Sequence, residues 1–404
     1  MIEPMFSSLT AESRYPQEKL EISHVSKNPL QIGMPKENRV FEKRLALTPE
    51  SVAILVAHGH HVIVETGAGE TIQYSDHDYS EAGAEIANHE RVWACEVVIK
   101  IASPVVDEVA LMRPNSILLS FLQLKLLSSE CLNCIAEKHI YAIAYDFITD
   151  DLGNLPIKNQ IREIEGRAAV MIAANLLTSE LGGKGILLGS CAGVSPTEVV
   201  IIGASRDGIE AARAAKALGA LVKVFDNRIE ALRNLQRQLG CDTFTSTMHP
   251  NVLRNSLRTA DVVIGTWRVE KDEKPSLITS DLIMTMKKGA LIIDLGVDMG
   301  GCFETSICPQ SSKDSYYIRY GVRHYCIPNL SSRVGRTTTI SLSNHILPIL
   351  LQMADSTSIS SFIRDNVFIR NGVYFYNGKL VNATVGEYFS CPWTDIMLFL
   401  TSFQ

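Results

Sequence analysis

Two features that would assign this chain to a special class are missing from its sequence. No apolar run approaches the roughly 18 to 20 residues that a helix needs to cross a bilayer, and the longest candidates, such as residues 290–295, have the length of a strand. Basic residues are not in excess: the formal net charge is -6, with both signs mixed along the chain. Such a surface does not neutralise nucleic-acid phosphates. We therefore expect neither a membrane protein nor a partner of DNA or RNA.

The chain also lacks a disulfide framework. Its nine cysteines are an odd number scattered through 404 residues, unlike the paired spacings of small secreted domains. A single CxxC, Cys131 and Cys134, lies in a helical stretch with no second pair to complete a zinc site, so we expect cysteines buried along a helix. Residues 1–29 lack the apolar core of a secretory signal and are expected to form a polar arm. These features favour the cytoplasm.

Two polar clusters resemble metal-ligand sets but lack essential members. His58, His60 and His61 occupy a helix-to-strand turn, where solvated turn residues are far more common than a metal site. Residues 76–78, Asp-His-Asp, lack the glycine and the distal glutamate of a calcium loop. We expect no metal.

From residue 31 onward the sequence alternates short apolar strands with amphipathic helices, the pattern of a parallel α/β architecture. The first unit pairs a strand at 31–34 with a helix that Thr48 caps and Pro49 begins. A long helical stretch at 160–181 is expected to bridge two domains, a helix follows at 337–353, and Asn377-Gly378 predicts a hairpin. We expect two doubly wound Rossmann-like domains. Their strands are predicted at 31–34, 62–64, 97–101, 117–121 and 142–145, and then at 199–202, 221–225, 262–265 and 291–295.

The strongest motif lies in residues 198–226, which run in the order strand, glycine-rich turn, helix, strand, acid. Gly203 permits the tight turn, Gly208 lets the helix pack on the strand, and the start of the helix offers N–H groups to a pyrophosphate. Asp226, 18 residues after Gly208, is placed to accept hydrogen bonds from the adenosine ribose. Because an acid there repels a 2′-phosphate, the motif favours NAD over NADP.

One position departs from this fingerprint. Ser205 stands where a glycine normally allows the backbone to come close to the pyrophosphate. The serine adds a Cβ at that point, yet its hydroxyl could donate to a phosphate oxygen, so we expect weakened rather than abolished binding. The alternative is a Rossmann-like domain whose nucleotide site has decayed.

Several segments, in order, resemble the alanine dehydrogenase family, which shares its fold with the NAD(H)-binding part of proton-translocating transhydrogenase. The resemblance implies a discontinuous catalytic domain at 30–158 and 332–404, an NAD-binding domain at 159–331, and a cleft between them. It also implies a homo-oligomer, a hexamer as in the family or a dimer as in the transhydrogenase relatives. The segments are IGMPKE (32–37), KRLALTP (43–49), HGHHVIVETGAG (58–69), VVIKIASP (97–104), EIEGR (163–167), the dinucleotide segment, VDMGGCFETS (297–306) and YCIPNL (325–330).

The resemblance also implies roles for individual residues. Arg44 would bind the substrate carboxylate through a bidentate pair of hydrogen bonds, although an arginine after a turn is by itself more often a surface residue. Lys100 follows an apolar strand, where it would point into the ligand crevice, and would be the catalytic lysine. Asp298 would act beside the nicotinamide, with the more structural Asp294 as runner-up. Asn329 would belong to the loop over the nicotinamide.

Four departures from the family pattern bear on the chemistry. Gln123 stands where the family usually has a histidine, and a glutamine can donate a hydrogen bond but cannot shuttle a proton. Ser103 replaces an acid, Arg162 replaces a small residue near the cofactor, and Ser331 replaces a proline in the loop after Asn329.

The leading hypothesis is reversible, NAD-dependent oxidative deamination of L-alanine, or a similar small amino acid, to its 2-oxo acid and ammonium. A transhydrogenase-type NAD(H)-binding subunit is a second hypothesis, but it would need partner subunits, and the chain has no apolar spans. A non-catalytic NAD-binding protein is the third, favoured by Gln123, Ser205 and Arg162.

Overall fold

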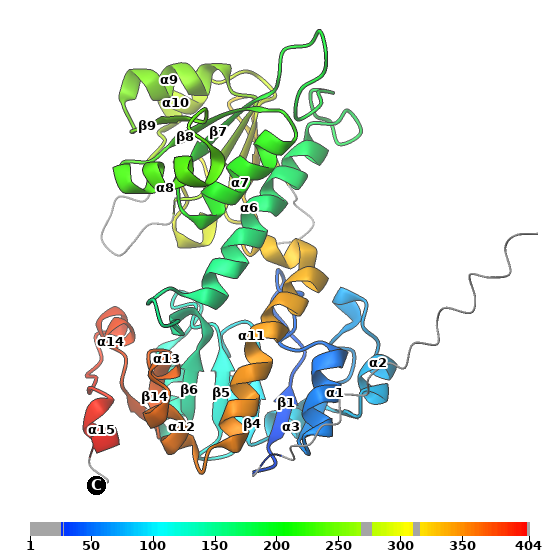
Figure 1. The fold of residues 1–404 in the computed structure, drawn as a ribbon, viewed down its shortest axis with the longest axis vertical. Helices are drawn as coiled ribbons and strands as arrows, with labels where there is room; N and C mark the ends of the chain where they lie inside the picture. Colours follow the sequence, from blue (N-terminus) through cyan, green and yellow to red (C-terminus); the bar gives the residue numbers. More distant parts are fainter. Residues whose placement is uncertain (1–25, 27, 268–276, 310–315, 402–404) are drawn as a thin grey trace, which may run out of the picture.

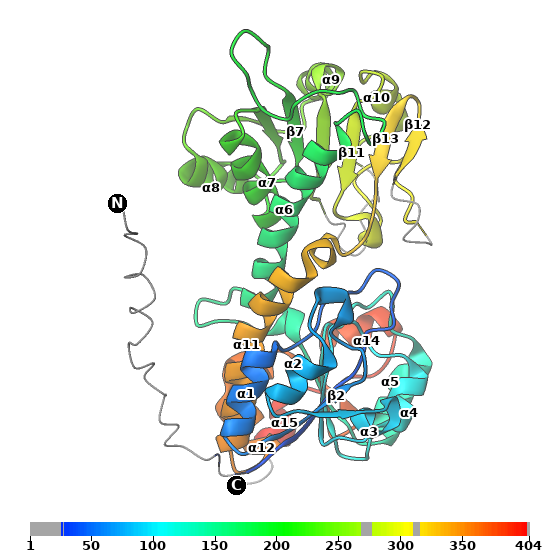
Figure 2. The same ribbon diagram turned by 90° about the vertical axis from the view of Figure 1, so that its right-hand side faces the viewer.

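The computed structural model describes residues 26, 28–267, 277–309 and 316–401, so the predicted polar arm lies almost wholly outside the described residues. Two β-sheets, each flanked by helices, lie at opposite ends of an elongated molecule (Figure 1). Two long helices, α6 (Pro156–Leu176) and α11 (Gly335–Asp355), run between them, and both are visible at the waist of the molecule in Figure 2. The expected α/β fold class with two doubly wound units is confirmed.

The lower sheet in Figure 1 is built from both ends of the chain. Its order is β15-β14-β6-β5-β4-β1-β2-β3, parallel throughout except that β14 runs antiparallel to β6 and β15. Helices α1 (Pro49–Ala57), α2 (Asp76–Glu81), α3 (His89–Trp93), α4 (Val106–Leu111), α5 (Ser129–Glu137), α12 (Ile359–Asp365), α13 (Val367–Arg370), α14 (Ala383–Phe389) and α15 (Met397–Thr401) accompany it. The strands are β1 (Gln31–Met34), β2 (His61–Glu65), β3 (Glu85–Ala87), β4 (Val97–Ile99), β5 (Ile117–Ser120), β6 (Tyr141–Ala144), β14 (Val373–Tyr376) and β15 (Lys379–Leu380).

The upper sheet has the order β12-β13-β11-β10-β7-β8-β9, in which only β12 is antiparallel to its neighbour. The chain runs outward from β7 to β9 and then returns to β10 on the other side, so the strand order reverses between β7 and β10. In open α/β sheets such a switch point marks the ligand crevice. The strands of the upper sheet and the helices that flank it are β7 (Glu198–Ile202), α7 (Arg206–Ala217), β8 (Leu221–Phe225), α8 (Ile229–Leu239), β9 (Phe244–Ser246), α9 (Pro250–Thr259), β10 (Val262–Gly265), α10 (Ser280–Met284), β11 (Leu291–Asp294), β12 (Tyr317–Arg319) and β13 (Val322–Tyr325).

Local signals in the sequence account for several element boundaries. Thr48 caps α1, accepting a hydrogen bond from Ser51 N, and Pro49 is its first residue, as expected. Asn377 and Gly378 both have positive φ, 48° and 73°, which is the backbone that a two-residue hairpin requires. Helix α6, however, begins at Pro156 and ends at Leu176, earlier at both ends than predicted.

Some expectations about isolated polar residues were wrong or only partly right. His60 is 2% exposed: its Nδ1 accepts from Leu30 N at 3.2 Å and its Nε2 faces the Ser26 hydroxyl at 3.1 Å, so it is a buried structural residue rather than a solvated one. Both CxxC cysteines lie on α5, but only Cys131 is buried, while Cys134 is partly exposed.

Within the described part of the chain, no single helix is long and apolar enough to span a membrane; a pair bent by 116°, residues 330–355 and 359–365, meets the length and composition criteria only jointly. The same residues hold no group of three or more metal-ligating side chains arranged around a common point.

The contact between α6 and α7 depends on Gly166. A Cβ at this position would lie 2.2 Å from the backbone oxygen of Asp207, in the first turn of α7. Real Cβ atoms do not approach an oxygen so closely, so only glycine lets the two helices meet here. Gly166 thus fixes the start of α7 against the helix that connects the two sheets.

Replacing Gly166 by alanine should separate α6 from α7 and lower the free energy of unfolding by about 1–3 kcal/mol, the usual range for overpacking. Urea unfolding measures this loss. Met171→Ala, on the same helix at a side chain that is 65% exposed, serves as the control and should change stability by less than about 0.5 kcal/mol. Equal effects of the two substitutions would contradict the assigned contact.

Candidate active site

The glycine-rich turn after β7 has the backbone geometry that the sequence predicts. Gly203 has φ 108°, and a Cβ there would lie 2.5 Å from Thr266 Oγ1. A Cβ at Gly208 would lie 2.1 Å from the backbone oxygen of Gly203. Neither position can hold a larger residue. The backbone at the start of α7 is therefore not covered by a side chain from either position. This cradle fits the pyrophosphate of a dinucleotide.

Ser205 fits into the turn without strain. It is the N-cap of α7 with φ -74° and ψ 179°, an ordinary extended backbone. Its hydroxyl donates to Asp207 Oδ1 at 2.5 Å and lies 3.4 Å from Thr266 Oγ1. Asp207 is fully buried in the first turn of the helix. The serine hydroxyl is therefore engaged by a neighbouring carboxylate, and a phosphate oxygen would have to compete for it.

Asp226 follows β8, as predicted, but its carboxylate is fully buried and already occupied. It accepts hydrogen bonds from Ala204 N at 2.8 Å and from Arg228 three times, from the backbone N at 2.8 Å, Nε at 3.1 Å and Nη2 at 2.9 Å. Burial opposes ionisation, yet the hydrogen bonds from Arg228 and Ala204 outweigh it and lower the pKa of Asp226. The acid expected to bind the ribose is thus an ionised carboxylate covered by an arginine.

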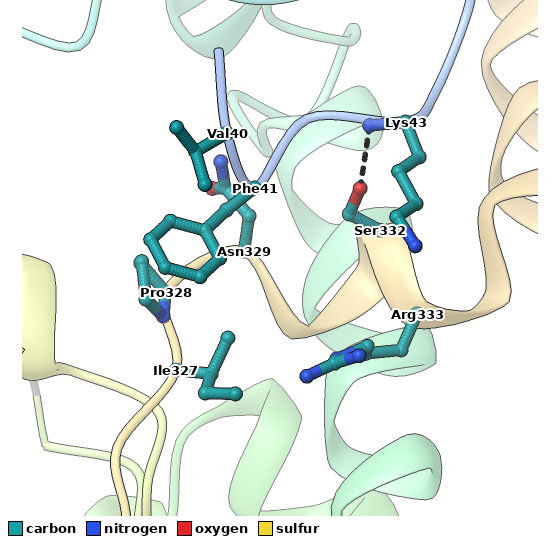
Figure 3. A pocket seen from close by; sticks show the side chains of 8 residues that line it. All are labelled: Val40, Phe41, Lys43, Ile327, Pro328, Asn329, Ser332 and Arg333. Atoms are coloured by element: carbon teal, nitrogen blue, oxygen red, sulfur yellow. Dashed lines mark hydrogen bonds between the residues drawn. The ribbon is translucent and has the colours of Figure 1, made fainter. Parts of the chain in front are cut away.

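The lower and upper units meet around the loop that contains Asn329. A pocket of about 20 Å³ lies between residues 40–43 of the lower unit and residues 327–333, which precede α11 (Figure 3). Lys43 N donates to Ser332 Oγ at 2.7 Å across this junction. Asn329 lines the pocket and has φ 52°, a left-handed conformation that asparagine tolerates.

Arg44 is 3% exposed, so the alternative of a surface arginine is wrong. Its guanidinium forms a bidentate pair with Glu42, with Nε to Oε1 at 2.7 Å and Nη2 to Oε2 at 2.5 Å. A third N–H group, on Nη1, donates to Ser331 Oγ at 3.0 Å, and this hydroxyl donates to Glu165 Oε1 at 3.2 Å. The carboxylate of Glu42 therefore occupies the bidentate position on Arg44 that was expected for the substrate carboxylate.

Lys100 does not point into an open crevice, which corrects the sequence-based expectation. Its side chain is completely buried, and Nζ lies 2.9 and 3.1 Å from the two oxygens of Glu108 and 3.7 Å from Glu37. The ammonium also lies 5.4 Å from the ring of Trp93. Because Trp93 and Glu108 belong to α3 and α4, the lysine is directed beneath these two helices, where its charge is balanced by carboxylates.

Glu37 joins this ion cluster to the loop after β4. Its carboxylate accepts hydrogen bonds from Ile101 N at 2.5 Å and Ala102 N at 3.4 Å. Burial raises its pKa to about 7, against the opposing effect of Lys100, and the charges of Glu42 and Glu108 raise it further. The cluster thus contains more carboxylates than cations.

Gln123 and Asp298 are the candidates with groups that remain available. Gln123 is partly exposed, has φ 41°, and its Oε1 accepts from Ser103 N at 3.1 Å. Since the amide oxygen is fixed by this N–H donor, Nε2 is the group left for a ligand. Asp298 is exposed in a 3-10 turn after β11, rather than closing that strand, and its backbone oxygen accepts from Lys125 Nζ at 3.1 Å across the two units.

Asp294 is structural, as the sequence analysis favoured. Its buried carboxylate accepts hydrogen bonds from Gly296 N, Cys302 N and the hydroxyl of Ser306, and so shapes the turn that carries Asp298.

Sequence reasoning missed the residues that neutralise the site. Glu42, Glu108 and Arg228 pair with the predicted Arg44, Lys100 and Asp226, and Glu37 completes the lysine cluster. The signal available was the nearness in sequence of opposite charges: Glu42 is two residues from Arg44 and Arg228 two from Asp226. Glu108, eight residues from Lys100, gave no such signal.

Comparisons with known proteins agree with this fold. Residues 33–163 match the model of the alanine dehydrogenase/PNT N-terminal domain, and residues 169–383 match that of the C-terminal domain. The chain belongs to this family. It is 35% identical to an alanine dehydrogenase of Mycolicibacterium smegmatis, over 91% of this chain and 99% of that one, and 35% identical to one of Staphylococcus saprophyticus, over 90% and 98%.

Solved structures give the same result. An L-alanine dehydrogenase superposes with a TM-score of 0.82 and 33% identity, over 89% of this chain and 99% of the other. A transhydrogenase from Sinorhizobium meliloti superposes with a TM-score of 0.73 at 21% identity, over 87% and 99%, which shows a shared fold alone. The family implies a nicotinamide dinucleotide as the cofactor and a small molecule as the substrate.

The raised pKa of Glu37 predicts a pH dependence of stability. Because the folded state holds this proton more tightly than the unfolded chain, whose value is 4.5, stability falls as the pH rises from about 4.5 to about 7. Glu37→Gln removes this loss. The variant should therefore gain stability relative to the wild type between pH 5 and pH 8, by about 3 kcal/mol in total.

Urea unfolding at pH 5, 6, 7 and 8 measures this difference. Glu70→Gln is the matched control, because the Glu70 side chain is 72% exposed; its curve should run parallel to that of the wild type. A Glu37→Gln curve that is also parallel would contradict the assignment of the buried proton to Glu37.

Proposed function

We propose that this chain catalyses the reversible oxidative deamination of L-alanine, or a similar small amino acid, to the 2-oxo acid and ammonium, with NAD as cofactor. One observation carries the proposal: a glycine turn that accommodates only a bare backbone occurs in a chain 35% identical, over nine-tenths of its length, to proteins named alanine dehydrogenase.

The proposed cofactor site uses the predicted residues of the upper unit. Gly203, Ser205 and Gly208 would hold the pyrophosphate at the start of α7, and Asp226 lies where the adenosine ribose would bind. Asp298 and Asn329 would flank the other end of the dinucleotide. When bound, the nicotinamide would accept or return the hydride of the reaction.

In the proposed substrate site, Arg44 would hold the carboxylate through the N–H groups that Glu42 does not occupy, or by exchanging Glu42 for the substrate. Gln123 would donate from Nε2 to the substrate oxygen, and Asp298 would orient or deprotonate the water that hydrolyses the imine. The enclosed position of Lys100 supports a positioning role, in which it holds Glu37 and the loop at 101–103 in place.

We further propose the division into residues 30–158 with 332–404 and residues 159–331, and a cytoplasmic homo-oligomer, hexameric or dimeric. The two sheets and the nine free cysteines support these proposals. Lys100 and Arg44, both paired with internal carboxylates, favour as a second candidate a non-catalytic protein that binds the dinucleotide.

The primary test is the oxidation of NADH by the chain with pyruvate and ammonium, followed by absorbance. Asp298→Asn should lower kcat by about 100-fold or more, since it removes a general base, while the Kd for NADH changes little. Asp365→Asn, on α12 at the far end of the lower unit in Figure 1, should retain full activity. NADH binding without turnover by the wild type would support the non-catalytic alternative instead.

A histidine at position 123 should make proton transfer possible where the glutamine cannot provide it. We expect Gln123→His to raise kcat/KM and to introduce a dependence on a group with a pKa near 6.5. Gln123→Leu, which lacks both functions, should lower activity. A rate profile identical for histidine and glutamine would show that this side chain takes no part in proton transfer.

A further inference from the structure

We infer that Lys125 is a positioning residue for the proposed reaction: it holds the turn of Asp298 against the loop of Gln123 across the junction of the two units. The inference rests on the proposed function, in which Asp298 acts on water and Gln123 donates to the substrate oxygen. Three features carry it: the hydrogen bond of Lys125, the way in which each loop is fixed, and the place of this bond among the contacts between the units.

The first feature is the contact itself. Lys125 Nζ donates to the backbone oxygen of Asp298 at 3.1 Å, from an exposed side chain in the loop after β5 to the 3-10 turn after β11. In the described part of the chain, this ammonium has no carboxylate at ion-pair distance, unlike those cations that pair with Glu42 or Glu108. Because the bond uses the backbone oxygen, the lysine does not occupy the Asp298 carboxylate.

The second feature is that the bond joins two loops that are each fixed within their own unit. On the lower side, Gln123 Oε1 accepts from Ser103 N at 3.1 Å, and Leu126 N donates to the backbone oxygen of Gln123 at 2.8 Å. Lys125 therefore projects from a closed turn that is attached to the loop after β4. Its reach toward the upper unit starts from a defined point.

The turn on the upper side is equally well defined. The buried Asp294 carboxylate accepts from Gly296 N at 3.0 Å and from Cys302 N at 2.8 Å, on either side of Asp298. A hydrogen bond between two such turns sets the separation of the residues they carry. Here these residues are the proposed base and the proposed donor to the substrate.

The third feature is the place of the bond. Two other hydrogen bonds cross the junction, from Lys43 N to Ser332 Oγ and from Arg44 to Ser331 Oγ, and both end on the turn before α11. Two units held at one turn can still rotate about it. The Lys125 bond adds a second point of contact, at the turn after β11, and so restricts this rotation.

The kinetic test compares variants in the oxidation of NADH with pyruvate and ammonium. Lys125→Met removes the donor and should lower kcat by about 10- to 100-fold, because a base displaced by about 1 Å reacts far more slowly. KM for pyruvate and the Kd for NADH should change by less than about 3-fold, since Lys125 holds neither ligand. Lys125→Arg keeps a charged donor and should restore most of the activity. Lys379→Met, an exposed lysine on β15, is the control and should be fully active.

A double-mutant cycle shows whether Lys125 acts through Asp298. Adding Lys125→Met to Asp298→Asn should cause no further loss of kcat, because the group being positioned is already gone. An independent role of the lysine would instead multiply the two losses, and this result would overturn the inference. So would a kcat of Lys125→Met equal to that of the wild type.

A second measurement does not depend on activity. Spin labels on unnatural amino acids at Asn133 of α5 and Met284 of α10, both exposed, report the distance between the units in labelled chain diluted into unlabelled chain. Lys125→Met should broaden this distance distribution and shift it to longer values. Identical distributions for the variant and the wild type would overturn the inference. A wild type that does not turn over NADH would remove the proposed function, and the distances alone would then decide whether Lys125 holds the two turns together.

Discussion

The position of the dinucleotide turn relative to the loops of the lower unit depends on backbone contacts at three glycines. Gly203 and Gly208 bring the start of α7 against the end of β7, and Gly166 brings the same turn against α6. Because α6 also reaches the lower sheet, these contacts fix the dinucleotide turn relative to the loops of the other unit (Figure 1). The same helix carries Glu163, which binds Arg206, and Glu165, which connects through Ser331 to Arg44. The turn proposed for the cofactor and the arginine proposed for the substrate are thus both connected to α6.

Charge compensation is the second constraint. A buried charge without a partner costs several kcal/mol, so each cation needs a nearby anion in the absence of ligand. Arg44 has Glu42, and Lys100 has Glu108 and Glu37. A substrate carboxylate therefore meets cations that already have carboxylate partners, and it gains the charge of either cation fully only by replacing a residue of the chain.

Such an exchange would involve both units of the molecule. Arg44 donates to the hydroxyl of Ser331 in the turn before α11, and Lys125 donates to the backbone oxygen of Asp298. Rearranging either pair changes a contact between the lower and upper units. Substrate binding and the relative position of the units are in this way coupled through named hydrogen bonds.

The sequence was informative where a local pattern determines the structure. Continuous apolar runs marked the buried parallel strands, and the spacing of Gly203, Gly208 and Asp226 located the dinucleotide turn. Strand β13 was missed because Arg323 and His324 interrupt its apolar pattern. Both are buried there, and Arg323 donates to the backbone oxygens of Leu176, the last residue of α6, and of Leu181 in the segment that follows. Nothing in the local sequence indicates that distant partner.

The direction of a side chain was harder to predict than its position. Lys100 follows β4 as expected, but strand alternation places it on the same side as Val98, and Val98 packs in the core with Trp93. Two of the predicted site residues share an unusual backbone. Gln123 follows β5 and Asn329 follows β13, and both hold a left-handed backbone, which costs a residue with a side chain of the order of 1 kcal/mol or more. A glycine would relieve this strain at both positions, as it would at the hairpin residue Asn377, so a left-handed backbone marks a tight turn and does not by itself identify a site residue.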